Sequence, residues 1–280
     1  MKRILLFLFL SIVLSACAEW TRTPASVKDR HVVFDIDWTI TSEVKPESKG
    51  SRLIEVEGKK YFVQDGIEEL IENLLAKDVK ISFFSGGSFS RNHTLLKSIV
   101  LSDGRTLEDI AYKILNREDL TTVPGSKPTD KFSVRYKKDL TKVSEDLSEL
   151  LMIDDTAGFT LNEKQNEHVL FLGKTFEHFN TFAEAKVAAG EYVPRSYEEW
   201  SFARKKLLIV NGSINHAFEE MHKTSMSFSE AMKLEASELN FASGEWNDYT
   251  RQLLKDNVFK APTQNTAACF KLMTPFLDIR

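Results

Sequence analysis

The sequence lacks the features that mark several large classes of protein. With only two cysteines, Cys17 and Cys269, it has no framework of disulfides to support its fold. Its formal net charge of −4 gives no general electrostatic attraction to nucleic acid or anionic lipid, so we expect no nucleic-acid partner. Internal repeats and low-complexity segments are missing as well. What remains is 280 residues of ordinary composition, 42% hydrophobic with 20 Phe, enough for one medium domain with an extension or two small domains.

The longest apolar run lies at the N-terminus. Lys2 and Arg3 precede residues 4–13, which are apolar except for Ser11, and this run is too short to span a bilayer comfortably. A basic head, a short apolar stretch and small residues before residue 17 are typical of a secretory signal. The residues Leu-Ser-Ala-Cys that end at Cys17 resemble the lipobox of bacterial lipoproteins, in which the cysteine becomes the lipid-modified first residue. An ordinary signal peptide or an uncleaved anchor is the alternative.

The lipobox resemblance implies a division of the N-terminal part and a location. Residues 1–16 are expected to be a lipoprotein signal peptide, and residues 17–30 the lipidated Cys17 and a polar tether. Because Ala18 rather than Asp follows the cysteine, we expect the lipoprotein to reach the outer membrane and to face the periplasm or the exterior. The protein is then expected to contact the membrane through its lipid anchor only.

Between residues 31 and 185, short apolar strands alternate with helical patterns. This order predicts an α/β domain with a parallel sheet and right-handed crossovers. Residues 53–63 alternate around a Gly-Lys pair and predict a small β-hairpin flap. The other predicted elements are strands at 31–34, 79–84, 110–115, 150–153 and 168–172, and helices at 66–75, 88–100 and 139–147.

Over residues 186–280 the pattern becomes helical. Apolar residues from Trp200 to Met221 fall three and four apart and form one stripe. Ser227 and Glu230 have the spacing of a capping box that opens a further helix. The stripe is either an interface for a partner or part of the core. We favour a helical extension that packs against the α/β domain, because such stripes are more often core.

The chemistry-bearing residues are concentrated at the ends of predicted strands. Asp35 and Asp37 follow the first strand directly, and Thr39 completes the same pentad. If the chain turns there, both carboxylates face one site. Phosphoryl transfer to a carboxylate needs such a pair, because one acid attacks phosphorus while the other protonates the leaving oxygen and later deprotonates water. A pentad of this kind also occurs by chance, so its context decides.

The other parts of a phosphoryl-transfer site follow in order along the chain. Ser85 and the two glycines after it offer a hydroxyl and bare backbone N–H groups to a phosphate. Lys138 supplies a cation for the phosphoryl group, with Lys137 as the alternative. Asp154 and Asp155, at the end of another strand, complete an all-oxygen shell for Mg²⁺.

In these motifs the chain resembles the haloacid dehalogenase (HAD) superfamily, and more closely its branch of NLI-interacting-factor-like phosphatases, the RNA-polymerase C-terminal-domain phosphatases. The resemblance extends over about residues 31–173 and is most specific at residues 136–155, YKKDLTKVSEDLSELLMIDD. It implies a Rossmann-like HAD fold for residues 31–185 and a Mg²⁺-dependent phosphatase activity. The resemblance implies that Asp35 is the nucleophile, that Asp37 is the acid/base, and that Lys138 serves catalysis and phosphate binding. It also implies that the phosphate is bound by Thr39, Ser85 and Gly86. The metal ligands that it implies are Asp35, Asp37 (through its carbonyl oxygen), Asp154 and Asp155.

The sequence therefore predicts a phosphomonoester hydrolase of the cell envelope that works through an aspartyl-phosphate intermediate. A non-catalytic scaffold lipoprotein on the same fold and a lipoprotein acid phosphatase of broad specificity are the alternatives. An RNA-polymerase tail is not expected as the substrate of an exported protein. The segment between Thr39 and Val79 leaves no room for a large cap. The cleft is therefore expected to be open and to admit phosphate on a macromolecule, unless the C-terminal helices fold over Asp35.

Two residues near the motifs have alternative interpretations. Trp38 is either a stacking platform for an aromatic leaving group or a residue that packs beneath the hairpin. Arg91 is expected to lie on the solvated face of the helix after Gly87 rather than to bind phosphate.

Overall fold

The computed structural model of the chain describes residues 29–257. The predicted signal peptide, the predicted lipidation site Cys17 and most of the tether lie outside these residues, as does the end of the C-terminal extension. Within the part that the structure describes, no helix combines the length and the apolar character needed to cross a membrane.

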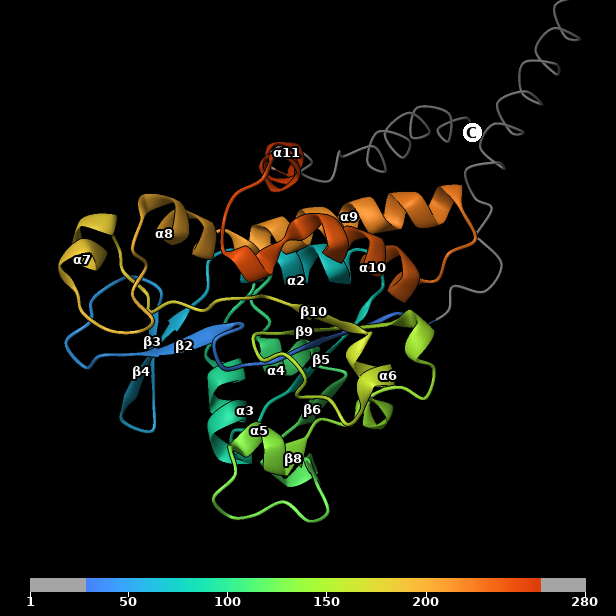
Figure 1. The fold of residues 1–280 in the computed structure, drawn as a ribbon, viewed down its shortest axis with the longest axis horizontal. Coiled ribbons are helices and arrows are strands. Elements are labelled where there is room, and N and C mark those ends of the chain that lie inside the picture. Colours follow the sequence, from blue (N-terminus) through green and yellow to red (C-terminus); the bar gives the residue numbers. More distant parts are fainter. Residues whose placement is uncertain (1–28, 258–280) are drawn as a thin grey trace, which may run out of the picture.

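A five-stranded parallel sheet forms the centre of the protein, in the order β10-β9-β1-β5-β6 (Figure 1). Its central strand is entirely buried, because a strand pairs with it on each side and apolar clusters cover both of its faces. Parallel strands end at the same edge of a sheet, so the residues that follow neighbouring strands lie side by side. The strands are β1 (His31–Phe34), β5 (Lys80–Phe84), β6 (Lys113–Leu115), β9 (Leu150–Asp154) and β10 (Val169–Phe171). The predicted α/β class with a parallel sheet is confirmed.

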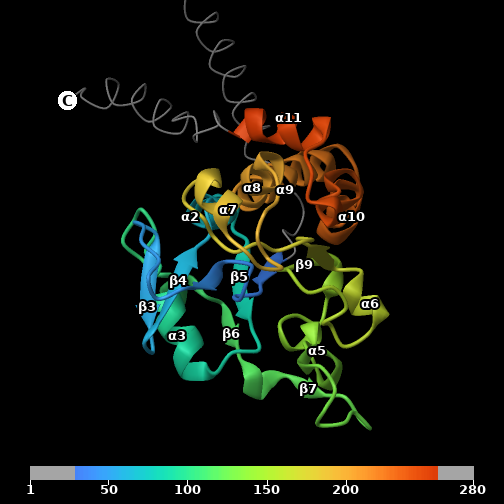
Figure 2. The same cartoon turned by 60° about the vertical axis from the view of Figure 1, so that its left-hand side comes forward.

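A small antiparallel sheet stands beside the main one (Figure 2). It consists of β2 (Thr41–Val44), β3 (Leu53–Val56) and β4 (Lys59–Val63), in the order β2-β4-β3. The predicted hairpin is confirmed as β3 and β4. Glu57 and Gly58 form its turn with φ of 52° and 77°, the left-handed conformation that two-residue hairpin turns use. The sequence pattern did not predict β2.

The connections of the α/β part differ in detail from the predicted elements. Helix α2 (Ile67–Leu75) agrees with the prediction, whereas α3 (Phe89–Lys97) ends earlier than predicted. The predicted strand at 110–115 begins later, because Thr106 and Asp109 form a capping box for a short helix that reaches residue 110. The remaining short elements are α4 (Leu107–Ile110), α5 (Phe132–Arg135), α6 (Glu163–Asn166), β7 (Thr121–Thr122), β8 (Tyr136–Lys137) and a 3₁₀ helix at Arg117–Asp119.

The predicted helix over residues 139–147 is wrong. This stretch contains two 3₁₀ helices, at Leu140–Lys142 and Leu147–Glu149. The carboxylates of Asp139 and Asp146 each accept a hydrogen bond from the backbone N–H two residues further on. Such local hydrogen bonds compete with the regular pattern of an α-helix, so the amphipathic spacing alone was misleading.

Helix α10 (Phe228–Leu239) covers one face of the sheet together with α2, and α9 (Lys206–Lys223) packs against both of them (Figure 1). The predicted stripe is divided between α8 and α9 at Arg204 and Lys205. Its residues from Leu207 to Ala217 are buried against α2 and belong to the main core, so the stripe is not a free interface. The predicted capping box opens α10. The helices are α7 (Phe182–Val187), α8 (Tyr197–Ala203), α9 (Lys206–Lys223), α10 (Phe228–Leu239) and α11 (Asp248–Asn257), with a 3₁₀ helix at Phe241–Ser243.

Candidate active site

Three strand ends bring predicted site residues together. Asp35 directly follows β1, Ser85 directly follows β5, and Asp154 is the last residue of β9. All three side chains are buried. The backbone N–H of Asp35 donates to the Ile153 carbonyl over 2.9 Å and so ties the end of β1 to the end of β9. The predicted parts of the site thus meet at one edge of the sheet.

Lys138 reaches this edge from a segment outside the main sheet. Its Nζ donates to Asp35 Oδ1 over 2.6 Å and to Asp154 Oδ2 over 2.7 Å, and the side chain is completely buried. Lys137 turns the other way and donates to the Gly158 carbonyl at the surface. Of the two candidate lysines, the structure therefore brings Lys138 to the site.

The charges at this edge shift the pKa values of its residues. Burial alone would lower the pKa of Lys138, but the carboxylates of Asp154 and Asp35 outweigh burial and raise it. Burial raises the pKa of Asp35 well above its ordinary value, and the neighbouring carboxylates add to this against the opposing charge of Lys138. Burial, and then the charge of Asp154, raises the pKa of Asp155 to about 7. The edge thus holds more carboxylate charge than the lysine neutralises.

Asp35, Asp154 and Asp155 form an acidic cluster, since one carboxylate oxygen from each lies within 4.8 Å of the others. Asp154 uses both of its oxygens, because Oδ1 accepts from the Thr156 N–H over 2.7 Å while Oδ2 is held by the lysine. Asp155 makes a longer contact of 3.4 Å with the Thr156 hydroxyl. Surplus negative charge on converging carboxylate oxygens suits Mg²⁺, so this donor set fits the predicted cation. The side chain of Asp37 does not join the cluster, and its carbonyl ligand stays a prediction.

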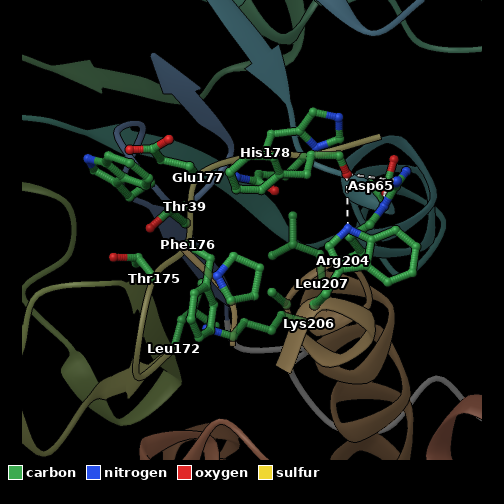
Figure 3. A pocket seen from close by; sticks show the side chains of 16 residues that line it. Thr39, Asp65, Leu172, Thr175, Phe176, Glu177, His178, Arg204, Lys206 and Leu207 are labelled. Atoms are coloured by element: carbon green, nitrogen blue, oxygen red, sulfur yellow. Dashed lines mark hydrogen bonds and ion pairs between the residues drawn. The ribbon is translucent and has the colours of Figure 1, made fainter. Parts of the chain in front are cut away.

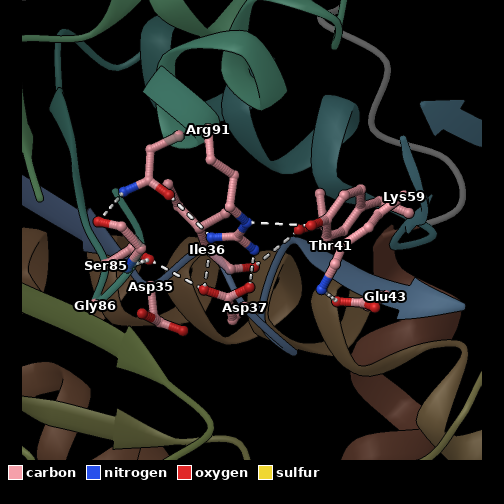
Figure 4. A network of polar contacts seen from close by, with 12 residues as sticks. Asp35, Ile36, Asp37, Thr41, Glu43, Lys59, Ser85, Gly86 and Arg91 are labelled. Atoms are coloured by element: carbon pink, nitrogen blue, oxygen red, sulfur yellow. Dashed lines mark hydrogen bonds and ion pairs between the residues drawn. The ribbon is translucent and has the colours of Figure 1, made fainter. Parts of the chain in front are cut away.

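Asp37 lies beside Asp35, and an arginine holds it. Nη1 of Arg91 donates to Asp37 Oδ2 over 3.0 Å, and Nη2 donates to Oδ1 (Figure 4). Ser85 Oγ also donates to Oδ2, over 3.1 Å. Burial would lower the pKa of Arg91, but its hydrogen bonds to Asp37 and the charge of that carboxylate outweigh burial and raise it. The prediction that Arg91 lies on a solvated helix face is therefore wrong.

The sequence held a signal for this arginine. Arg91 occupies the first turn of α3, where the positive end of the helix dipole disfavours a cation. A cation in that position needs an anionic partner to be stable. Parallel strand order places the acid pair after β1 next to the loop before α3. That pair was therefore the nearest predicted anionic partner for Arg91.

The loop between β5 and α3 is closely packed around its two glycines. Ser85 Oγ accepts a hydrogen bond from the Gly87 N–H over 3.0 Å. A Cβ added at Gly86 would lie 2.7 Å from the Phe132 ring, and one added at Gly87 would lie 2.3 Å from Arg91 Nη1. The guanidinium therefore rests against the backbone of this loop, in a space that a side chain would fill.

Asp35, Asp37 and Asp155 open onto a cavity of about 540 Å³. One wall comes from the small sheet and is charged, and the opposite wall is aromatic, with Phe132 and Phe159. Within residues 29–257, its lining residues all fall between positions 35 and 159, so α7 to α11 do not close it. A neighbouring groove of about 800 Å³ shares Trp38 and Glu43 with this cavity.

Trp38 belongs to the wall of these two openings. Its backbone is left-handed, with φ of 62°, and its ring lies against Tyr192 with the ring centroids 5.5 Å apart. The side chain is half-buried. It therefore lies between this cavity and the groove and is not part of the buried core beneath the hairpin.

The Thr39 hydroxyl makes no hydrogen bond to the acid pair. The residue is 1% exposed, its hydroxyl makes no hydrogen bond, and it lines a separate cavity of about 40 Å³ (Figure 3). Lys206, at the start of α9, lines the same small cavity. The predicted role of Thr39 in phosphate binding stays a prediction.

Comparison with known proteins gives one family. The model of the family described as NLI interacting factor-like phosphatase matches residues 30–170. No curated protein sequence matches the chain. Among solved structures, similar ones include a variant of the fission yeast RNA polymerase II CTD phosphatase Fcp1 bound to beryllium fluoride. The two sequences are 14% identical, and the match covers 87% of this chain and 66% of that chain with a TM-score of 0.36. A second structure of Fcp1, an essential RNA polymerase II CTD phosphatase, has 14% identity over 82% of this chain and 61% of that chain, at a TM-score of 0.35. The chain thus spans less than two thirds of the length of these proteins, and likeness at this level says nothing about its substrate.

Proposed function

This chain belongs to the family of NLI interacting factor-like phosphatases, and on that premise we propose that it is a Mg²⁺-dependent phosphomonoester hydrolase that forms an aspartyl-phosphate on Asp35. The observation that carries the proposal is the buried contact of Lys138 with both Asp35 and Asp154, beside Asp37 and the loop at Ser85. A nucleophilic carboxylate, a fixed cation and a second acid are what this chemistry requires.

The residues of the chain divide the reaction between them. Asp35 attacks phosphorus with the oxygen that Lys138 does not hold, and the bond from phosphorus to the leaving oxygen breaks. Asp37 gives that oxygen a proton, and it then takes a proton from the water that cleaves the acyl-phosphate and releases phosphate. Lys138 neutralises charge on the nucleophile and on the phosphoryl oxygens. The Ser85 hydroxyl and the N–H of Gly86 orient the phosphoryl group.

The acidic cluster is where a divalent cation would bind. Asp35 and Asp155 would supply carboxylate oxygens and Asp37 its carbonyl oxygen, while Asp154 would orient Lys138 and the turn after β9. The cation would supply positive charge that neutralises the phosphate as it approaches the carboxylates.

The substrate and the location belong to the same proposal. A cavity that the C-terminal helices leave open suits a phosphomonoester on a bulky molecule. Lipidation at Cys17 would hold the enzyme at the cell envelope, facing the periplasm or exterior. A lipoprotein acid phosphatase of broad specificity and a non-catalytic scaffold are the competing functions, and the intact acid pair favours an enzyme over the scaffold.

The test of activity is turnover of an aryl phosphate by the purified protein with Mg²⁺ and with EDTA. Asp35→Asn should reduce turnover to the level of the buffer, because an amide cannot form the acyl-phosphate. Asp103→Asn, which alters an exposed ion pair with Arg105, is the matched control and should retain activity. Clear turnover by a folded Asp35→Asn variant, or full activity after chelation, would contradict the mechanism.

The test of location is the fractionation of cells that express Cys17→Ser. Loss of the thiol should remove the acyl modification and move the protein from the membrane fraction to the soluble fraction, or leave an uncleaved precursor. Unchanged fractionation with no change in mass would exclude the lipid anchor.

A further inference from the structure

The ion pair between Asp37 and Arg91 conflicts with the work proposed for Asp37. Both carboxylate oxygens of Asp37 accept N–H groups of one guanidinium, and Oδ2 also accepts from Ser85. Oδ1 keeps one lone pair, but it lies beside the guanidinium, so neither oxygen can turn fully toward a leaving group while the ion pair is closed. A proton on either oxygen would compete with the N–H groups of the guanidinium, so the bidentate contact has to open before Asp37 can act as the acid.

The position of the Arg91 guanidinium indicates which new partner it can reach when the ion pair opens. Its Nη1 lies against the backbone of Gly87, in the loop that would orient the phosphoryl group. Nη1 also donates to Asn92 Oδ1 over 3.0 Å, and Nε donates to the Tyr61 hydroxyl over 3.2 Å. These neutral partners keep the side chain at the loop even when its contact with Asp37 is broken.

The phosphoryl group is the stronger partner for this cation. A phosphomonoester brings up to two negative charges and planar pairs of oxygens, which the fork of an arginine binds bidentately. The other cations that line the cavity are held differently, since Lys59 pairs with Glu43 and Arg117 donates to the Gly86 carbonyl. Arg91 is the cation of this wall that already contacts the acid pair.

We propose that Arg91 is a phosphate-binding residue that exchanges partners, from the carboxylate of Asp37 in this structure to the non-bridging phosphoryl oxygens of the bound substrate. The exchange frees Asp37 to face the leaving oxygen and couples its release to the arrival of a phosphate. The inference rests on the proposed function and adds to it a specificity device, because a neutral ester cannot draw Arg91 away.

The test is a double-mutant cycle in which binding of orthophosphate is measured by calorimetry in buffer with Mg²⁺. Arg91→Gln should weaken binding by about 10-fold to 100-fold, the usual loss for a hydrogen bond to a charged group. Asp37→Asn should tighten binding, because the arginine is no longer held. Arg91→Gln added to Asp37→Asn should still weaken binding. If Arg91 serves only to neutralise Asp37, the double variant will bind like Asp37→Asn, and that result would overturn the proposal.

Further variants separate a direct role from a structural one. Arg91→Lys keeps the positive charge but lacks the two-pronged guanidinium, so it should recover part of the lost orthophosphate affinity. This variant also provides a measurement if Arg91→Gln does not fold. Ser90→Ala removes another contact between α3 and the hairpin, the hydrogen bond to Glu57, and should leave orthophosphate affinity unchanged. Equal losses in Ser90→Ala and Arg91→Gln would mean that Arg91 only tethers the hairpin.

The binding measurement also separates this proposal from the hydrolase proposal. A wild-type protein that gives the expected cycle but hydrolyses no phosphomonoester would leave the Arg91 assignment intact and contradict the enzyme. If the wild-type protein hydrolyses phosphomonoesters but Arg91→Gln binds orthophosphate as tightly as the wild type does, the Arg91 assignment alone is contradicted.

Discussion

Lys138 stabilises the site at the level of a single residue. Its buried ammonium contacts two carboxylates that have little other compensation inside the protein. A buried pair of this kind adds little over an apolar core, but the loss of one partner leaves the other charge unpaired. Folding and chemistry therefore depend on the same side chain.

We expect Lys138→Met to abolish turnover and to lower the free energy of unfolding by about 3–5 kcal/mol, because Asp35 and Asp154 would then be buried without a cation. Urea denaturation followed by circular dichroism measures the loss. Lys137→Met is the matched control, since this half-buried neighbour bonds only to a carbonyl at the surface and should change stability by less than about 0.5 kcal/mol. If Lys138→Met and Lys137→Met lower the free energy of unfolding by similar amounts, the ion pairs of Lys138 do not contribute to stability.

The pKa of Asp155 should make binding of the proposed cation dependent on pH. Its folded-state pKa of about 7 lies above the ordinary value of 3.8, so the folded protein binds this proton more tightly than the unfolded chain. The resulting stabilisation is fully present below pH 3.8 and is lost as pH rises through 7. A cation competes with the same proton, so its apparent affinity should be about 100-fold lower at pH 5 than above pH 7.

The rise in melting temperature on adding Mg²⁺ should therefore be larger at pH 8 than at pH 5. Thermal unfolding with Mg²⁺ and with EDTA at both pH values measures it. Burial lowers the pKa of His178 to about 4, so this residue destabilises the fold as pH falls below 6.5. Because the melting temperatures with Mg²⁺ and with EDTA are compared at the same pH, the effect of His178 cancels. Asp155→Asn should reduce the difference between the two pH values, and an unchanged difference in that variant would locate the titrating group elsewhere.

At the scale of elements, the strands were the predictable part. A buried strand such as β1 is a continuous apolar run bounded by polar residues, and that pattern survives in almost any tertiary setting. Acids at the ends of β1 and β9 could be placed together from the parallel order alone. Most of the candidate site is therefore predictable from the residues that end the strands.

The missed elements depend on contacts that a single stretch of sequence does not contain. β2 forms only because β4 lies beside it, and its alternation over four residues is too short to recognise. The stretch 139–147 has helical spacing, but side-chain hydrogen bonds of Asp139 and Asp146 select 3₁₀ turns. Arg91 was misplaced for a related reason, since its partner lies 54 residues away.

At the scale of the whole molecule, the position of the C-terminal helices determines access to the site. Among them, α9 packs on α2 and α10 on the sheet face beside it, and the catalytic cavity is lined by residues 35 to 159. We therefore expect kcat/KM to be higher for phosphate on a protein or surface polymer than for small sugar phosphates. Assays of phosphopeptides, phosphorylated polymers and sugar phosphates under one condition measure this. Kinetics that strongly favour a small metabolite would contradict the open-cleft interpretation.

The two walls of the cavity have an evolutionary consequence. Asp35 follows a strand of the main sheet, and the charged wall belongs to the small sheet, whereas the aromatic wall includes Phe159, which lies against Lys138. A substitution in the charged wall can change which molecules fit without moving Asp35 relative to Lys138. New substrate preferences are therefore open to this protein through single mutational steps in the small sheet, each of which leaves the proposed phosphoryl-transfer centre in place for selection to act upon.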